Sequence, residues 1–134
     1  MVRSFAVAVL AAACVFPTAV GASPCPLSNG EAIVLRSSYF DPDVLVWDTR
    51  QRAVDYVNGN IKSASEVLPH TVLSRSGTHA IVVACDPATS QPRYSPVPLD
   101  TVGIKITNGP NRGRYGWVSS GDAHAGSTAR WTDQ

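Results

Sequence analysis

Charged residues are scarce in this sequence, and neither sign predominates. Asp, Glu, Lys and Arg make up 16% of the 134 residues, and the formal net charge is +1. In an average globular protein roughly a quarter of the residues are charged. No block concentrates charge of one sign, which argues against a nucleic-acid-binding surface of the usual electrostatic kind. The length allows one domain.

The motifs of common metal sites and enzymes are also missing. The histidines His70, His79 and His124 do not fall at a zinc-site spacing, and no pair of cysteines flanks them. Neither the Gly-x-Ser-x-Gly elbow of a serine hydrolase nor a glycine-rich phosphate loop occurs. We therefore expect no metal and no cofactor, and a binding protein is favoured over an enzyme.

A long uncharged run is present near the N-terminus. It extends from Ser4 to Val20 behind a basic start, as in a membrane-spanning helix or a secretory signal peptide. Pro17 disfavours a spanning helix, and the run ends in Val-Gly-Ala, which suits a signal peptidase. We interpret residues 1–22 as a signal peptide and predict a periplasmic or secreted protein with no membrane span in its mature chain.

A lipoprotein is the less favoured alternative. The segment Leu10-Ala-Ala-Ala-Cys14 resembles a bacterial lipobox, in which the cysteine is lipidated. The leucine lies four residues before Cys14, however, whereas such boxes usually have it three before. The apolar run also continues beyond Cys14, which is unusual for a lipoprotein tether.

Two cysteines, Cys25 and Cys85, follow the predicted signal peptide. Since an exported chain meets an oxidising compartment, we predict a disulfide between them. Closing a loop of about 60 residues would stabilise the fold by about 4 kcal/mol. A nucleophilic Cys85 assisted by His70 or His79 is the alternative, but no catalytic-cysteine signature surrounds it.

Short β-branched runs separated by Gly and Pro predict a mainly β fold. The expected strands are 31–36, 44–47, 71–74, 79–84, 102–107 and 114–118. In the strand at 102–107, Val102, Ile104 and Ile106 alternate with smaller or polar residues, which predicts one buried face. Asp48 or Thr49 is placed to cap a short helix over residues 50–57, and Asn58-Gly59 is placed to end it. A β-hairpin through Gln51 is the alternative for this segment. Four prolines between residues 87 and 98 predict a loop or an edge segment there.

The segment VGIKITNGPNRGRYGWV, residues 102–118, resembles the C-terminal hairpin of bacterial SH3-like domains. The resemblance covers about residues 70–118 and implies a small barrel that this hairpin closes. We therefore expect a mainly β protein: a small SH3-like barrel with one short helix and an N-terminal extension. The expected organisation is a signal peptide at 1–22, an extension at 23–42, the β domain at 43–121 and a flexible tail at 122–134.

The resemblance also implies a ligand site, because aromatic side chains near such loops line a peptide groove in SH3-like modules. It points to Tyr94, Tyr115 and Trp117. Tyr115 and Trp117 alternate with Gly116 and so share a face of their strand. For Trp117 a place in the core is the alternative.

The predicted function is that of an exported, non-catalytic binding module for a peptide, a cell-wall fragment or a partner protein. A small secreted hydrolase, or an inhibitor of one, is the alternative. A cleft in which His79 or His124 lies at hydrogen-bonding distance from a carboxylate would favour the enzyme. An open aromatic groove without such a pair would favour binding.

Overall fold

The computed structural model describes residues 25–126, so the predicted signal peptide and Cys14 lie outside the described residues. The described chain is mainly β, as expected. Its strands are β1 (Ala32–Leu35), β2 (Asp43–Trp47), β3 (Thr71–Arg75), β4 (His79–Ser90), β5 (Leu99–Ile106), β6 (Tyr115–Ser119) and β7 (Ala123–Ala125). Between β2 and β3 lie the helices α1 (Arg50–Val57) and α2 (Ala64–Val67) and a 3-10 turn, η1 (Leu68–His70). The prediction of a single short helix was therefore wrong, since the described residues form two.

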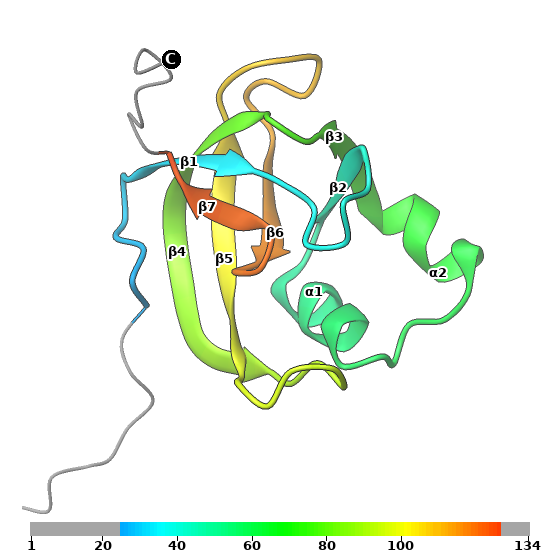
Figure 1. Cartoon of the computed structure of the whole chain (residues 1–134). Helices are drawn as coiled ribbons and strands as arrows, with labels where there is room; N and C mark the ends of the chain where they lie inside the picture. Colours follow the sequence, from blue (N-terminus) through cyan, green and yellow to red (C-terminus); the bar gives the residue numbers. More distant parts are fainter. Residues whose placement is uncertain (1–24, 127–134) are drawn as a thin grey trace, which may run out of the picture.

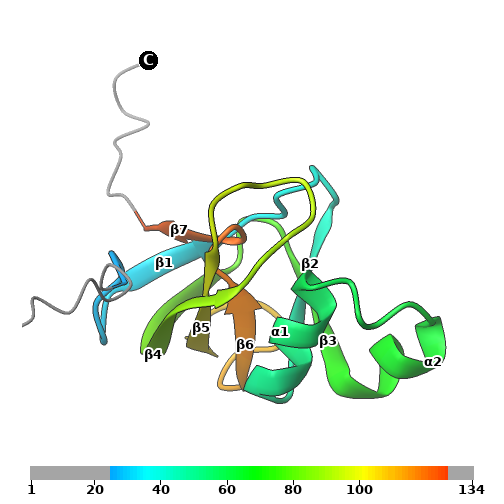
Figure 2. The same ribbon diagram turned by 90° about the horizontal axis from the view of Figure 1, so that it is seen from below.

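All described strands belong to one antiparallel sheet in the order β3-β2-β6-β5-β4-β1-β7. The sheet curls into a half-barrel (Figures 1 and 2). The predicted hairpin of residues 102–118 is confirmed, because β5 pairs with β6 on one side and with β4 on the other. Gly109 and Gly113 in its turn have positive φ angles of 77° and 89°, which glycine adopts at little cost.

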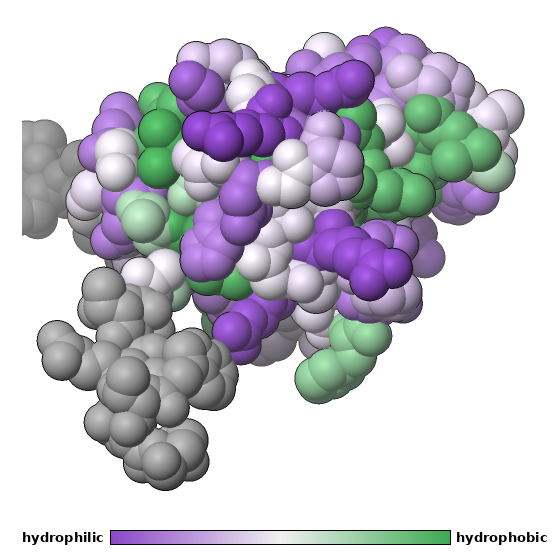
Figure 3. All heavy atoms as spheres, turned by 90° about the horizontal axis from the view of Figure 1, so that it is seen from above, coloured by the Kyte–Doolittle hydropathy of each residue, from purple (hydrophilic) through white to green (hydrophobic). Residues whose placement is uncertain are grey.

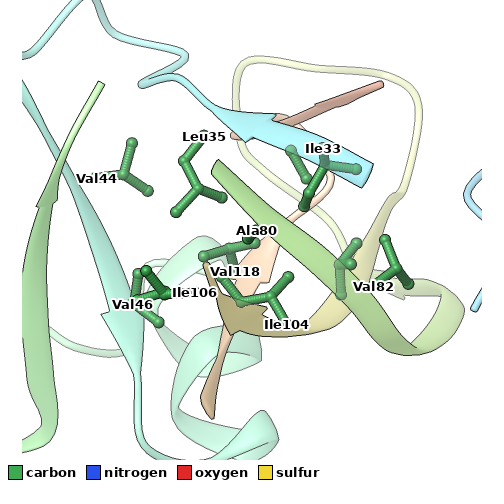
Figure 4. Packing of buried hydrophobic residues seen from close by; sticks show 11 residues of the cluster. Ile33, Leu35, Val44, Val46, Ala80, Val82, Ile104, Ile106 and Val118 are labelled. Atoms are coloured by element: carbon green, nitrogen blue, oxygen red, sulfur yellow. The ribbon is translucent and has the colours of Figure 1, made fainter. Parts of the chain in front are cut away.

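The main core lies on one face of the curled sheet (Figure 4). Alternate residues of each strand face it, as the two-residue period of β structure requires. Its buried members are Ile33, Leu35, Val44, Val46, Ala80, Val82, Val102, Ile104, Ile106, Val118 and Ala123. Gly116 belongs to this face too, where its lack of a side chain lets β6 approach Val46 of β2.

Helix α1 covers the opposite face of β2 and β6. Trp47 follows the core residue Val46 and therefore points to the other side of β2, where it is 98% buried. Its ring lies 5.1 Å from that of Tyr56 on α1, measured between centroids. Ala53 and Val54 of the helix are buried as well. The interior of the protein thus has a second, smaller apolar layer between helix and sheet.

The sequence signals for α1 are confirmed. Thr49 has extended backbone angles, and its hydroxyl accepts a hydrogen bond from the backbone N–H of Arg52, which makes it the N-cap. Gly59 follows the C-cap Asn58 with a φ of 79° and ends the helix. The hairpin alternative for this segment was wrong. No helix among residues 25–126 has the length and apolar character needed to cross a membrane.

Strand β4 is longer than the sequence predicts, since it continues through Pro87 to Ser90. The register with β5 shifts between Asp86 and Ser90, and Ala88 in this stretch has a positive φ of 51°. A proline is tolerated at such an irregularity because the ladder does not need its missing N–H. Of the two expectations for this segment, the loop was therefore partly wrong, since residues 86–90 pair with β5; β1 pairs only with residues 79–81 of β4, so this end of the strand fits the expected edge segment.

The sheet also extends beyond the predicted β domain at both ends. Strand β1 lies within the range expected as an extension, yet Ile33 and Leu35 are fully buried. Strand β7 lies within the range expected as a flexible tail, and it pairs with β1 through residues 123–125. Both segments contribute backbone hydrogen bonds to the sheet, so the structural unit is wider than residues 43–121.

Candidate functional site

The described residues contain a cavity of about 320 Å³ between α1, the β1–β2 connection (36–42) and the β4–β5 connection (91–98). Figure 1 shows α1 between these two connections, drawn in cyan and yellow-green. We call this cavity the aromatic cleft, because four aromatic side chains line it. They are Tyr39, Trp47, Tyr56 and Tyr94.

The tyrosine rings of the aromatic cleft are accessible. Tyr39, Tyr56 and Tyr94 are 57%, 37% and 62% exposed. The rings of Tyr39 and Tyr94 meet edge to face, with centroids 5.6 Å apart and planes at 75°. Tyr56 stacks at a tilt on the buried ring of Trp47. The cleft thus presents ring edges and faces at several orientations instead of one flat surface.

Carboxylates share the lining with these rings. Asp41, Asp43 and Asp122 line the aromatic cleft, together with one cation, Arg93. The Arg93 guanidinium lies against Gly59, with Nε about 3.5 Å from the point that a Cβ would occupy there. The cleft therefore contains more negative than positive groups.

Asp122 is the best shielded of these carboxylates. Burial raises its pKa above the ordinary value, although hydrogen bonding by Ser38 and the charge of His124 act in the opposite direction. The backbone N–H of Ser38 donates to Asp122 Oδ1 at 2.8 Å. Burial also raises the pKa of Tyr56, and the nearby carboxylates of Asp122 and Asp41 raise it further. The electrostatic potential at the Tyr56 hydroxyl is accordingly made more negative by the lining of the cleft.

Hydrogen bonds hold the β1–β2 connection in place. The Ser76 hydroxyl accepts from the backbone N–H of Ser37 and donates to the carbonyl of Asp41. Within this connection Phe40 has a φ of 61°, a strained conformation for a bulky residue, and its side chain is 98% exposed. The backbone N–H of Tyr39 donates to the Ser37 hydroxyl at 3.2 Å, which adds a further hydrogen bond to this connection.

The structure separates the three predicted ligand-binding residues. Tyr94 lies in the aromatic cleft. Tyr115 is 65% exposed in a different hollow beside His70, and the Lys105 ammonium lies 5.6 Å from its ring centroid. Trp117 is half-buried, and its ring packs on Gly103 of β5, where a Cβ would come within 3.1 Å of it.

Sequence reasoning missed Tyr39, Tyr56 and Asp122. A usable signal existed for Tyr39, because Tyr39 and Phe40 are adjacent aromatic residues in a segment that ends in the turn sequence Asp41-Pro42. Tyr56 follows the buried residues of α1 and was not distinguished from them. Asp122 lies in a segment rich in Ser, Gly and Ala that resembles a tail, so nothing in its surroundings marked it.

A histidine–carboxylate pair lies outside the aromatic cleft. His70 Nδ1 is 2.9 Å from Asp48 Oδ2, and Arg52 also contacts Asp48 at 3.2 Å. Burial opposes ionisation of Asp48, but the hydrogen bonds of His70 and Arg52 outweigh it and hold its pKa below the ordinary value. Asp48 fixes the orientation of the imidazole, as carboxylates do in many hydrolases.

The other two histidines lie elsewhere. His79 and His124 are exposed on β4 and β7, and in the described residues neither side chain forms a hydrogen bond or ion pair with a carboxylate. The geometry that would have favoured an enzyme is thus found at His70 and not at either expected histidine.

The predicted disulfide is present between Cys25 and Cys85. Asp100 lies close enough to both sulfurs to resemble a metal-ligand group. Disulfide sulfurs are not thiolates, however, and the Asp100 Oδ1 atom accepts a hydrogen bond from the backbone N–H of Ala88. The group therefore does not fit a metal ion while the disulfide is intact.

Exposed apolar side chains are also found away from the aromatic cleft. On the face in Figure 3, hydrophobic surface gathers toward the side where α2 lies, among otherwise hydrophilic groups. Leu68, directly after α2, is 67% exposed, and Leu73 of β3 is 53% exposed. Neither residue lines the aromatic cleft.

Comparisons of this chain with protein-family models, with curated proteins and with solved structures found no match.

Proposed function

We propose that this protein is an exported, non-catalytic binding module of the SH3-like type, and that it recognises a peptide segment in the aromatic cleft. One observation carries the proposal. Tyr39, Tyr56 and Tyr94 come from three separate segments and converge on one cavity with their rings accessible. Tyrosine supplies a large contact area and a polar hydroxyl while losing little conformational entropy, which suits it to recognition.

Two further features support the export and the architecture in this proposal. The Cys25–Cys85 disulfide is of the kind that persists in oxidising compartments. The hairpin of β5 and β6 pairs with β4 through β5 in a curled sheet. This is the arrangement expected of a hairpin that closes a small barrel.

The shape of the aromatic cleft favours a peptide over a cell-wall glycan. A sugar ring packs best on a flat aromatic face, whereas the rings of Tyr39 and Tyr94 stand at 75° to each other. The volume of about 320 Å³ is at the small end of the range for ligand pockets, roughly 300–1,000 Å³. Such a space suits one or two amino-acid side chains.

The test is selection of binders from a phage-displayed library of random peptides, followed by affinity measurement with synthetic copies. We expect Tyr39→Ala and Tyr94→Ala to weaken binding by about 1–2 kcal/mol each, because each removes an accessible ring from the site. Tyr115→Ala is the matched control, since it removes an equally exposed tyrosine outside the cleft. Full affinity in the Tyr39→Ala/Tyr94→Ala double variant would refute the proposal.

Purified peptidoglycan serves as the second probe in the same experiment. If the wild-type protein sediments with peptidoglycan and the Tyr94→Ala variant does not, the ligand of the cleft is a cell-wall fragment and not a peptide. If the library yields peptides that bind the cleft and the protein does not sediment with peptidoglycan, a peptide is supported as the ligand.

A second candidate function is that of a small hydrolase, favoured by the pair His70–Asp48. An imidazole oriented by a carboxylate is suited to general-base chemistry. The described residues give the His70 side chain this one hydrogen-bonding partner, so none of their hydroxyl groups is hydrogen-bonded to the imidazole. Hydrolysis of peptide or ester substrates that is abolished in His70→Gln and retained in Tyr39→Ala would establish this alternative.

A further inference from the structure

The aromatic cleft contains carboxylates that form no ion pair with a cation of the described residues. The ion pairs of residues 25–126 involve Asp86 with Arg50, and Asp48 with Arg52 and His70. Asp41, Asp43 and Asp122 of the cleft form none of them. Arg93 is the one cation in the lining, against three carboxylates. A cationic group that entered the cleft would therefore find an excess of negative charge.

The tyrosine rings favour the same kind of ligand. The face of an aromatic ring attracts a cation within about 6 Å of its centroid, and the attraction strengthens where water is excluded. Tyr39 and Tyr94 meet edge to face, so their ring planes bound the cleft from two directions. Tyr56 adds a third accessible ring close to the carboxylates of Asp122 and Asp41. Rings and carboxylates thus occur together, as in sites that bind ammonium groups.

The position of Asp122 makes it the principal anion for such a group. The backbone N–H of Ser38 orients its carboxylate from the β1–β2 connection. Partial burial lowers the screening by water, so an ion pair formed there is stronger than one on an open surface. The other titratable groups that act on Asp122 are His124 on β7, which lowers its pKa, and Asp41 in the β1–β2 connection, which raises it. Asp122 nevertheless has no ion-pair partner in the described residues.

We propose that the aromatic cleft selects a cationic side chain, the ammonium of lysine or the guanidinium of arginine, seated against Tyr39, Tyr56 and Tyr94 and facing Asp122. This inference rests on the proposed function and names the chemistry that the peptide ligand must carry. The cavity of about 320 Å³ accommodates such a side chain and leaves the rest of the peptide outside.

The experiment uses three short probes that differ in one central side chain: acetyl-Gly-Lys-Gly-amide, its norleucine analogue and its glutamate analogue. Binding to the oxidised protein is measured by NMR from the ring resonances of the three tyrosines and the backbone amide of Ser38. We expect the lysine probe to bind about tenfold more tightly than the norleucine probe, which keeps the four-carbon chain of lysine but lacks its terminal ammonium. The glutamate probe should bind most weakly, and added salt should weaken the lysine probe selectively.

Two matched variants assign the effect to the cleft. Asp122→Asn keeps an oxygen for the Ser38 N–H and removes the charge, so it should weaken the lysine probe about two- to fivefold and leave the norleucine probe unchanged. Asp55→Asn removes a carboxylate of α1 that does not line the cleft, and it should leave both probes unchanged.

The outcomes separate this inference from the proposed function. Equal binding of the lysine and norleucine probes at the tyrosine rings would overturn the cationic selectivity and leave peptide binding intact. An equal loss of affinity for the lysine probe in Asp122→Asn and Asp55→Asn would also overturn the cationic selectivity of the cleft, because the effect would then come from net charge alone. Absence of any response at the tyrosine rings to all three probes would refute the inference, and phage selection would decide the proposed function independently.

Discussion

Removal of the Cys25–Cys85 disulfide should lower the free energy of unfolding by about 4 kcal/mol. The two cysteines are 60 residues apart in the sequence. In the loop-entropy model, a cross-link over that separation removes about 14 cal/mol/K from the entropy of the unfolded chain, which is about 4 kcal/mol at 25 °C. Domains are typically stable by about 5–15 kcal/mol, so the loss is a large fraction of the total.

The effect should arise mainly in the unfolded state, because the native contacts near Cys25 do not depend on the bond. The backbone N–H of Gly30 donates to the carbonyl of Val82 at 2.6 Å, and the N–H of Val82 donates to the carbonyl of Glu31 at 2.9 Å. Strand β1 is also paired on both sides. The N-terminal segment therefore has other attachments to the sheet when the cross-link is absent.

The assay is urea unfolding followed by tryptophan fluorescence, on the oxidised protein, the reduced protein and the Cys25→Ala/Cys85→Ala variant. We expect a lower midpoint for the reduced protein and for the variant, and a steeper dependence on urea, since the unfolded chain becomes more expanded without its cross-link. Stabilities within about 1 kcal/mol of the oxidised protein for both forms would refute the loop-entropy reasoning.

Two other perturbations have signs that the structure determines. Gly116→Ala should destabilise the protein by about 1–3 kcal/mol or more, because the new Cβ would overlap Val46 Cγ1 and lie 2.9 Å from the carbonyl oxygen of Trp47. Thermal unfolding measures this loss, and Gly121→Ala, whose Cβ would meet only ordinary contacts of 3.5 Å or longer, should remain close to wild type. Asp122→Asn should raise the melting temperature at about pH 7, because burial raises the pKa of Asp122 and so makes its ionisation unfavourable in the folded state. The folded state then binds this proton more tightly than the unfolded state, and the stability of the wild type falls as pH rises through the raised pKa. The difference between the two proteins should vanish below the ordinary carboxyl pKa of about 4, and a gap independent of pH would contradict the reasoning.

Local patterns in the sequence were sufficient for most of the secondary structure. The alternation of Val102, Ile104 and Ile106 with smaller or polar residues predicted a strand with one buried face, and all three side chains are fully buried. Thr49 and Gly59 marked the two ends of α1 because capping depends on neighbouring residues only. The disulfide followed from there being two cysteines in a chain expected to be exported.

Strand β7 had no local signal, for a physical reason. Its sequence, Ala123-His-Ala125, has no apolar run, and it forms by backbone hydrogen bonding to β1, which is almost independent of side-chain type. Pairing that depends on a distant partner leaves little trace in the sequence. The same holds for Pro87, which is accommodated within β4 by a register shift that only the partner strand reveals.

The sequence by itself determined the β character, the faces of the strands, the helix α1 and the cross-link, since each depends on near neighbours or on a count of residues. It also put Tyr115 and Trp117 on one face of β6. Only the tertiary structure decided that α1 covers the other face of the sheet at Trp47, and that Tyr39, Tyr56, Tyr94 and Asp122 meet at one cavity. These four residues span more than half of the described chain, and the curl of the sheet, which depends on all its strands together, brings them into one place.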